Sequence, residues 1–467
     1  MNKEALQLTE VQTPALDCSL VPVQITDSTI EQRKRKVLAL MQQENIDSLV
    51  IYADLEHGSN FEYLVGFLPR FEEALLILHK HGEAFLVLGN ENIKKAKFSR
   101  IEVKAIHAPQ FSLPNQPMVG EKSMAEIYQE AKLETGSTIG VVGWKLFTSQ
   151  YQDTKKLFDV PHYLIEELFT ISTHITNRTD IFISADYGVR AINNANEIAH
   201  YEFGSSLASD SILKAMDTLD IGRSEIELGA ALNNGGQKNT VVTIAATGER
   251  FYKGNLYPTD KKVKLQDTIA LTVGYKGGLS SRAGYAVYET SQLPVHQQDY
   301  LDVVVKPYFN AIIVWLENIH CGMLGGELYT LINEVLPKEK YHWSLCPGHL
   351  TSDEEWMSSP IYENSKESIK SGMLFQTDII PAVPGYGATS VESTVILADQ
   401  ALQESIKQEY PLLWERMMKR KEYLKNELHI FLHDDVLPMA STLGYLRPYL
   451  LNKNCAMKKI VNEQEVD

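Results

Sequence analysis

Two short segments of the sequence carry residue types that could do chemistry. The first, "TIALTVGYKGGLSSRAGYAVYE" from Thr268 to Glu289, has two β-rich runs around a glycine-rich turn, and Arg282 lies in its second run. A guanidinium is permanently charged, and its planar fork of donors fits a carboxylate. The second segment is "CPGHL", in which His349 follows a Pro-Gly pair in a predicted loop. Since histidine is the usual acid–base group near neutral pH, the two segments offer an anion-binding cation and a proton-transfer group.

Both residues also have a structural interpretation. Arg282 could form an ordinary ion pair that neutralises buried acids, and His349 could be a hydrogen-bonded histidine with no ligand. A buried charge needs a partner in either case, so the residue types alone leave both interpretations open.

Other common catalytic and binding motifs do not occur. The sequence has no GxxxxGK[ST] phosphate loop and no GxSxG nucleophile elbow. Its four cysteines are scattered without CxxC spacing, so neither a zinc knuckle nor a disulfide framework is indicated. Reduced thiols are therefore expected at all four positions, which are Cys18, Cys321, Cys346 and Cys455.

The composition is that of a soluble globular protein. Of the 467 residues, 44% are hydrophobic and 22% are charged, and the formal net charge is −16. This charge disfavours binding to nucleic acid or to an anionic membrane, which would need a basic face. The N-terminus has no apolar signal-peptide core, and no stretch approaches the roughly 20 apolar residues of a membrane span. We expect a soluble, cytoplasmic protein.

The order of predicted elements divides the chain into two main domains. After a leader at 1–27, helices and strands alternate, which predicts an α/β domain over 28–180. In 181–400, helix pairs and antiparallel strands occur twice in similar order. This repetition predicts a pseudo-duplicated α+β domain with an antiparallel sheet and flanking helices, in which Ser224 caps a helix. Residues 401–467 begin with a charged helix and are predicted to form a helical extension.

Six phrases occur in a fixed order along the chain, from "NFEYLVGFLP" through "NEIAHYEFGSSLASDSI", "LQDTIALTVGYKGG" and "PGHL" to "IKSGMLFQTDIIP" and "VESTVILAD". In content and order they resemble the creatinase/aminopeptidase P family, which has the "pita-bread" fold and includes Xaa-Pro peptidases. Together they span roughly residues 28 to 400. The resemblance implies an α/β N-terminal domain followed by the pita-bread domain.

In the peptidases of this family, two Asp, one His and two Glu hold two divalent metal ions. The resemblance places Thr272 and Arg282 at the aspartates, His349 at the histidine, and Asp378 and Glu392 at the glutamates. The segment between the first two positions is one residue shorter than in the family. Two ions bring a charge of +4 against only two carboxylates, and Arg282 adds a further positive charge. We therefore predict a degenerate metal site; one ion at His349, Asp378 and Glu392 remains an alternative.

The resemblance also implies changed substrate contacts. Asn255 and Trp356 stand where the family has histidines, and Tyr285 stands where it has an arginine. Because Asn255 replaces the histidine base of creatinase, that mechanism does not carry over. Trp356 could be a stacking wall or could simply fill space, and Tyr285 could line the pocket or pack in the core. Acidic residues 353–355 are expected to form a solvated turn.

The leading prediction is a metal-independent enzyme, without cofactor, that hydrolyses or lyses a small amide, amidino or amino-acid-like substrate. In this hypothesis His349 is the acid–base group, Asp378 and Glu392 orient a water or a cationic group, and Arg282 binds an anion. One alternative is a catalytically inactive protein that binds a small molecule, a short peptide or another protein. Another is a one-metal Xaa-Pro peptidase. Members of the family are commonly dimers, so a homodimer is expected.

Overall fold

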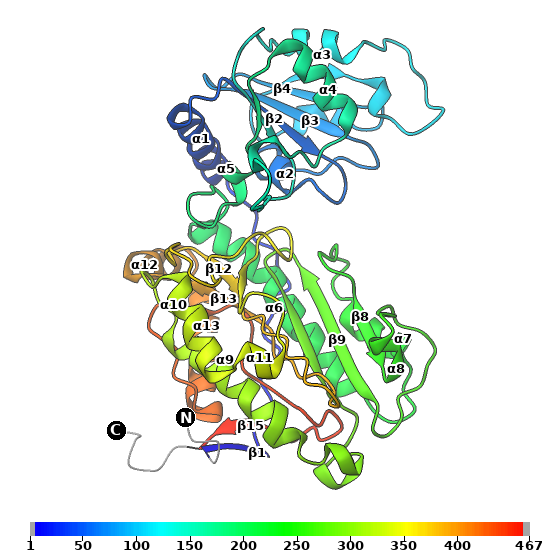
Figure 1. Ribbon diagram of the computed structural model, residues 1–467, viewed down its shortest axis with the longest axis vertical. Coiled ribbons are helices and arrows are strands. Elements are labelled where there is room, and N and C mark those ends of the chain that lie inside the picture. Colours follow the sequence, from blue (N-terminus) through cyan, green and yellow to red (C-terminus); the bar gives the residue numbers. More distant parts are fainter. Residues whose placement is uncertain (1–4, 461–467) are drawn as a thin grey trace. The chain divides into compact units, whose positions relative to one another are not determined.

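The computed structural model describes residues 5–460, which form two compact units (Figure 1). One unit comprises residues 25–191, and the other comprises residues 5–24 together with residues 192–460. The border at Ala191 lies beyond the position near residue 180 that the sequence indicated. The segment before it stays with the first unit, because Tyr63 donates to the carbonyl of Val189 (3.0 Å) and Arg190 donates to Asn60 (2.8 Å).

The unit of residues 25–191 is built on a six-stranded sheet in the order β5–β4–β3–β2–β6–β7. Strands β2, β3 and β4 are antiparallel neighbours, whereas β5, β6 and β7 join in parallel. The strands are β2 (Ser48–Ala53), β3 (Ala74–His79), β4 (Ala84–Leu88), β5 (Lys104–His107), β6 (Ile139–Val142) and β7 (Ile175–Asn177). The helices are α1 (Asp27–Gln43), α2 (Ser59–Val65), α3 (Met124–Glu130), α4 (His162–Ile171) and α5 (Asp180–Ile183).

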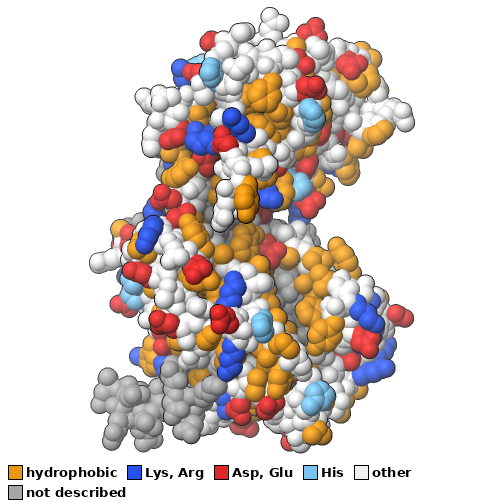
Figure 2. Space-filling model, in the orientation of Figure 1, with side chains coloured by type: hydrophobic (Ala, Val, Ile, Leu, Met, Phe, Trp, Pro, Cys, Tyr) orange, Lys and Arg blue, Asp and Glu red, His pale blue; other side chains and the backbone are white. Residues whose placement is uncertain are grey.

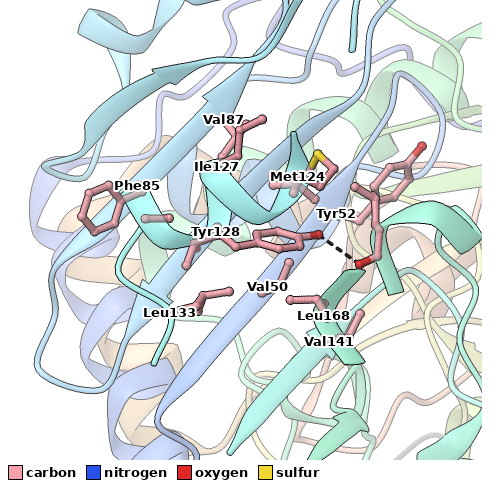
Figure 3. Close-up of a cluster of buried hydrophobic side chains, with 14 of the residues drawn as sticks. Val50, Tyr52, Phe85, Val87, Met124, Ile127, Tyr128, Leu133, Val141 and Leu168 are labelled. Atoms are coloured by element: carbon pink, nitrogen blue, oxygen red, sulfur yellow. Dashed lines mark hydrogen bonds between the residues drawn. The ribbon is translucent and has the colours of Figure 1, made fainter. Parts of the chain in front are cut away.

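Alternate residues of the central strands form the core of this unit (Figure 3). Val50 and Tyr52 of β2 point to the same face, because side chains alternate along a strand, and α3 and α4 cover that face. Tyr128 of α3 lies within the cluster, and its hydroxyl donates to the carbonyl of Leu164 (3.1 Å), the bond drawn in Figure 3. The predicted α/β character of the segment thus corresponds to a mixed sheet with helices packed on it.

The other unit contains two antiparallel sheets, in the orders β10–β9–β8 and β11–β12–β13–β14. A long helix, a shorter helix and a set of strands occur twice in succession. The first set is α6 (Ala195–Thr218), α7 (Glu225–Leu232), β8 (Ile244–Thr247), β9 (Thr268–Tyr275) and β10 (Gly278–Tyr285). The second set is α9 (Lys306–Asn318), α10 (Gly325–Val335), β11 (His349–Leu350), β12 (Leu374–Gln376) and β13 (Thr394–Leu397).

Local signals explain where these helices begin. Asn194 and Ser224 cap α6 and α7, each forming a capping box with the glutamate three residues into the helix. The cap predicted at Ser224 is confirmed. The remaining helices of this unit are α8 (Glu249–Tyr252), α11 (Lys338–Tyr341), α12 (Gln400–Glu409) and α13 (Pro411–Tyr423).

Both ends of the described chain join this unit. Strand β1 (Leu6–Glu10) pairs antiparallel with β15 (Cys455–Lys459), and β14 (Val436–Pro438) pairs with β13. The segments predicted as a leader and as a helical extension therefore both contribute strands here. Within residues 5–460 no helix is both long and apolar enough to cross a membrane. On the face shown in Figure 2, acidic and basic side chains are interspersed among hydrophobic ones.

A buried arginine ties the N-terminal segment to α13. Arg420 is 3% exposed and donates to both carboxylate oxygens of Asp17 (2.7 Å each), to Glu202 (2.7 Å) and to the carbonyl of Pro438 (3.2 Å). Removing one member of such a buried pair leaves an uncompensated charge. The Arg420 contacts thus hold three segments that are far apart in the sequence.

We expect Arg420→Met to lower the free energy of unfolding by about 3 kcal/mol, because it leaves Asp17 without its cation and Glu202 with Arg416 as its remaining partner. Urea-induced unfolding followed by circular dichroism measures the change. Lys419→Met, at an exposed position of the same helix, is the control and should stay within about 0.5 kcal/mol of wild type. Equal stabilities of the two variants would contradict the role assigned to Arg420.

Candidate functional site

The hairpin of β9 and β10 has a two-residue turn that determines its register. Tyr275 pairs with Gly278, so Lys276 and Gly277 form the turn, and Thr272 pairs with Ser281. Gly277 has a φ of +99°, and a Cβ there would run into the carbonyl of Tyr201, so only glycine fits. The hydroxyl of Thr272 donates to that of Ser281 (2.9 Å). Ser281 was not among the predicted site residues. The segment between Thr272 and Arg282, one residue shorter than in the family, was the signal that the neighbouring position could pair with Thr272.

Arg282 lies on the opposite face of the hairpin from Thr272 and Ser281. It is 1% exposed, and burial lowers its pKa to about 10. Its guanidinium donates to the carbonyls of four residues and, more weakly, to the hydroxyl of a fifth. The carbonyls are those of Tyr445 (3.2 Å), Ser281 (2.7 Å), Glu392 (2.8 Å) and Thr442 (2.5 Å), and the hydroxyl is that of Ser393 (3.4 Å).

This environment contradicts the predicted role of Arg282. Among the described residues it forms no ion pair with the carboxylates of Asp378 or Glu392, and its donors are directed at backbone oxygens. The resemblance placed Thr272 and Arg282 at the two aspartate positions, whereas in the hairpin Thr272 pairs with Ser281 and Arg282 pairs with Leu271. Arg282 instead joins the hairpin to the segment after β14.

His349, Asp378 and Glu392, here called the triad, converge at the ends of three neighbouring strands. His349 begins β11 and pairs with Gln376 of β12, two residues before Asp378. Gln376 pairs in turn with Thr394 of β13, two residues after Glu392. All three side chains are buried, with exposures of 0%, 5% and 6%. The structure thus brings together three of the residues that the resemblance selected.

Each triad residue has a buried acceptor atom without a donor among the described residues. His349 Nε2 lies 3.8 Å from Asp378 Oδ2 and 4.0 Å from Glu392 Oε1. Since His349 Nδ1 lies 3.2 Å from the carbonyl of Leu350, which can only accept, Nδ1 carries the proton of the neutral ring and Nε2 presents a lone pair. Nε2, Asp378 Oδ1 and Glu392 Oε1 have no hydrogen-bond partner among the described residues.

Burial disfavours charge on every member of the triad. It lowers the pKa of His349 to about 4, so the imidazole is neutral. Burial also raises the pKa of Asp378 and of Glu392, and the neighbouring carboxylate of Glu355 raises both further. Unpaired buried acceptors each cost about 1–3 kcal/mol, so a cation or a proton between these atoms would stabilise the site.

Three protein ligands of this kind fit one metal ion. One nitrogen or oxygen atom of each triad residue lies within 4.8 Å of the other two. An imidazole nitrogen and two carboxylates are a common ligand set for divalent ions such as Zn²⁺. The hydroxyls of Thr272 and Ser281 carry no charge and bond to each other, so they add no anionic ligand.

Trp356 covers the triad histidine. Its ring stacks on that of His349 with the centroids 4.0 Å apart and the planes at 20°. The tryptophan is 41% exposed, whereas the imidazole beneath it is buried, so Trp356 separates His349 from solvent. Of the proposed substrate-binding residues, Trp356 is the one in ring contact with the triad.

The other two predicted contact residues lie in different surroundings. Asn255 is exposed in the segment after α8, and among the described residues no side-chain contact links it to the triad. Tyr285 is 2% exposed; its hydroxyl accepts from the amide of Gly387, and its ring meets that of Tyr300 edge-on at 4.8 Å. Tyr285 therefore packs in the core.

The turn that carries Trp356 is less solvated than expected. Asp353 has a side chain that is only 8% exposed, and it lies 3.4 Å from Lys276 and accepts from the Tyr201 hydroxyl (3.2 Å). Glu355 is half-buried, and its carboxylate raises the pKa of Asp378 and of Glu392. In the sequence, three consecutive acidic residues predict a solvated turn. In the structure, the side chain of Asp353 is largely buried and Glu355 is half-buried.

Relatives with this architecture are Xaa-Pro peptidases. The sequence matches no protein-family model. It is 22% identical over 306 residues to an Xaa-Pro dipeptidase of Pyrococcus furiosus. The aligned region covers 64% of this chain and 81% of that protein. The prolidase of Pyrococcus horikoshii superposes with a TM-score of 0.59 at 18% identity, over 79% of this chain and 95% of that one. The dipeptidase PepE of Mycobacterium ulcerans superposes with a TM-score of 0.61 at 16% identity, over 80% of this chain and 95% of that one.

At these identities the superpositions establish the fold, which is that of the pita-bread peptidases with its mixed α and β content. Together with the matching sequence, they confirm the resemblance to the creatinase/aminopeptidase P family.

We expect Arg282→Lys to lower the free energy of unfolding by about 3 kcal/mol or more, because one ammonium cannot reach carbonyls that surround a planar guanidinium. Urea unfolding measures this change. Arg223→Lys, an exposed substitution of the same kind, should stay within about 0.5 kcal/mol of wild type. A fully stable Arg282→Lys protein that had lost ligand binding would restore the anion-binding role.

Proposed function

We propose that the chain is a hydrolase of the Xaa-Pro dipeptidase type whose site binds one divalent cation at His349, Asp378 and Glu392. The observation that carries the proposal is that three buried side chains bring a ligand atom each to within 4.8 Å of one another, and that each has an acceptor atom without a hydrogen-bond partner among the described residues. In proteins such atoms are nearly always paired, and a shared cation would satisfy all three at once.

The hydrogen bonds of Arg282 weaken the main objection to this ion, because its guanidinium donates to backbone carbonyls, although its charge still lowers the pKa of Glu392. A guanidinium among the triad carboxylates would compete with a metal ion for them. The metal-independent site was predicted from the sequence on this ground. Arg282 is instead directed at backbone carbonyls on the other face of the hairpin. The triad therefore keeps two carboxylates without a protein cation bonded to them.

The residues present do not fit a second ion. Two divalent ions in contact need several bridging or terminal anionic ligands to offset their mutual repulsion. Thr272 and Ser281 offer neutral hydroxyls at the hairpin, and these satisfy each other. We accordingly propose one ion per chain rather than the pair that the family's peptidases use.

The protein residues have defined tasks in this site. A bound divalent ion would polarise a carbonyl and make a water more acidic. His349 keeps its Nε2 lone pair directed at the carboxylates, because Leu350 accepts the Nδ1 proton and Trp356 stacks on the ring. Asp378 and Glu392 supply the negative charge, and their buried position excludes water that would weaken their interaction with a cation.

The substrate proposal follows from the relatives. The curated and solved proteins that this chain resembles are described as Xaa-Pro dipeptidase, prolidase and dipeptidase. We propose an Xaa-Pro dipeptide or a similarly small amide as the substrate. Hydrolysis of a small amide without metal, with the neutral His349 as the base, is the competing mechanism that the test below separates.

We expect purified protein to bind one Mn²⁺ per chain and to hydrolyse an Xaa-Pro dipeptide only when the ion is present. Calorimetric titration of the metal-stripped protein gives the stoichiometry, and proline release gives the activity. His349→Ala should weaken Mn²⁺ binding by at least about 100-fold and abolish hydrolysis, since it removes a direct ligand.

The control is His296→Ala at an exposed position, which should match wild type in both measurements. Two ions per chain would contradict the single-ion site. Hydrolysis that persists in excess chelator would favour the metal-independent mechanism, and absence of both metal binding and hydrolysis would overturn the proposal.

A further inference from the structure

Ser281 of the β9–β10 hairpin lies beside a member of the triad. Its amide donates to the carbonyl of Glu392 (3.2 Å). Two residues further along β10, Ala283 bridges Ser390 in the antiparallel sense, and Ser390 lies two residues before Glu392. Opposed residues of an antiparallel pair point to the same face, with Cβ atoms about 4.5–5.5 Å apart. The side chains of Ser281 and Glu392 are therefore neighbours.

The row that contains these two residues continues on both sides. On one side, Thr272 of β9 pairs with Ser281. On the other side, the register of β12 with β13 places Asp378 opposite Glu392, just beyond the ends of the two strands. Both acids lie within 4.0 Å of His349 Nε2. The hairpin thus presents two hydroxyls to the same face on which the triad meets.

Ser281 is open to solvent at this point of the row. Of the eight residues of β10, it is the one that is partly exposed, and the other seven are buried. Thr272 and Glu392, its neighbours in the row, are 7% and 6% exposed. A small molecule can therefore reach the Ser281 hydroxyl, which lies next to a buried triad carboxylate.

The bond between the two hydroxyls leaves one proton unused. Thr272 donates to Ser281 Oγ (2.9 Å), and among residues 5–460 the Ser281 hydroxyl has no acceptor for its own proton. His349 Nε2 presents a lone pair, since the Nδ1 proton is directed at the carbonyl of Leu350, and ionised carboxylates only accept. Ser281 thus holds the free proton of this row. The bond that it accepts also polarises its hydroxyl, which strengthens its donation.

We propose that Ser281 is a further catalytic residue, whose hydroxyl donates to the carbonyl oxygen of the scissile amide. This role rests on the hydrolase function proposed above, and it concerns contact with the substrate rather than with the ion. Hydroxyl groups are among the donors that stabilise the oxyanion formed in acyl transfer. In a site whose other side chains are acceptors, the developing negative charge on that oxygen needs such a donor.

The hydrogen bond acts on the oxygen at which charge develops. When the oxygen of a water bonds to the amide carbon, the π electrons of the carbonyl move onto its oxygen, and a triad carboxylate accepts the proton that the water loses. When the C–N bond breaks, the electrons return to form the carbonyl of the acid product, and the nitrogen takes that proton and leaves as an amine. Ser281 keeps its own proton throughout, and its donation is strongest while the oxygen is negative.

The test compares Ser281→Ala with Ser280→Ala, a matched control on the same strand. Ser280 is buried on the opposite face, and its hydroxyl has no hydrogen-bond partner among the described residues, so its removal should leave kcat as in wild type. We expect Ser281→Ala to lower kcat for an Xaa-Pro dipeptide by about 100- to 1,000-fold and to change KM by less than about 3-fold. Ser281→Thr keeps the hydroxyl and should stay within about 10-fold of wild type.

Calorimetry gives two readouts that do not depend on turnover. A phosphinic analogue of the dipeptide has a tetrahedral anionic centre in place of the amide, and Ser281→Ala should weaken its binding by about 100-fold or more. The same variant should bind Mn²⁺ with the affinity and stoichiometry of wild type, because its hydroxyl is a donor to the substrate.

The outcomes separate this role from the proposed function. Wild type that neither binds Mn²⁺ nor hydrolyses the dipeptide overturns both. Hydrolysis that is as fast in Ser281→Ala as in wild type overturns the role of Ser281 alone. An equal loss in Ser280→Ala would reflect distortion of β10, and weaker Mn²⁺ binding in Ser281→Ala would make the residue a ligand; either result also overturns it. Should Ser281→Ala not fold, Ser281→Cys replaces the hydroxyl by a weak donor, and full activity of that variant decides against the role.

Discussion

The register of the β9–β10 hairpin controls which chemical groups face the candidate site. A two-residue turn at Lys276 and Gly277 pairs Thr272 with Ser281 and turns Arg282 to the other face. A slip of one residue would exchange the two faces, because side chains alternate along a strand. The slip would move the Arg282 guanidinium to the face that carries Thr272 and Ser281, and the carbonyls of Thr442 and Tyr445 would lose their donor. The conformation of Gly277 at the turn thus helps to decide on which face of the hairpin the guanidinium lies.

The remaining electrostatics follow from that register. The carboxylates that meet at His349 come from the ends of β12 and β13, where Asp378 follows the first strand and Glu392 precedes the second. The fold is that of the pita-bread peptidases, and His349, Asp378 and Glu392 meet at its strand ends. A fold fixes where its strands lie but not which residues they carry, and function depends on those residues.

Much of this organisation could be predicted from the sequence, and the exceptions share a physical cause. The helix expected from Asn194 to Leu219 is α6, and Ser224 caps the next helix, because capping and helical periodicity are local signals. The resemblance selected His349, Asp378 and Glu392, which do meet. Arg282 was misplaced because its partners lie about 160 residues away and because register depends on turn conformation. The partial burial of Glu355 was not predicted, because three consecutive acidic residues give no local sign that one of them is shielded from solvent.

The pairing of β1 with β15 has a consequence for biosynthesis. Residues 25–191 form their own unit within the chain, whereas β1 must wait for a partner at residues 455–459, which is synthesised after that unit. During translation the inserted unit can fold first, since domains generally fold as units. Over that interval β1 presents an unpaired edge, the kind of surface that invites association with other chains. A chain that stops before β15 would retain this exposed strand permanently, so its earliest defect would be one of solubility rather than of chemistry.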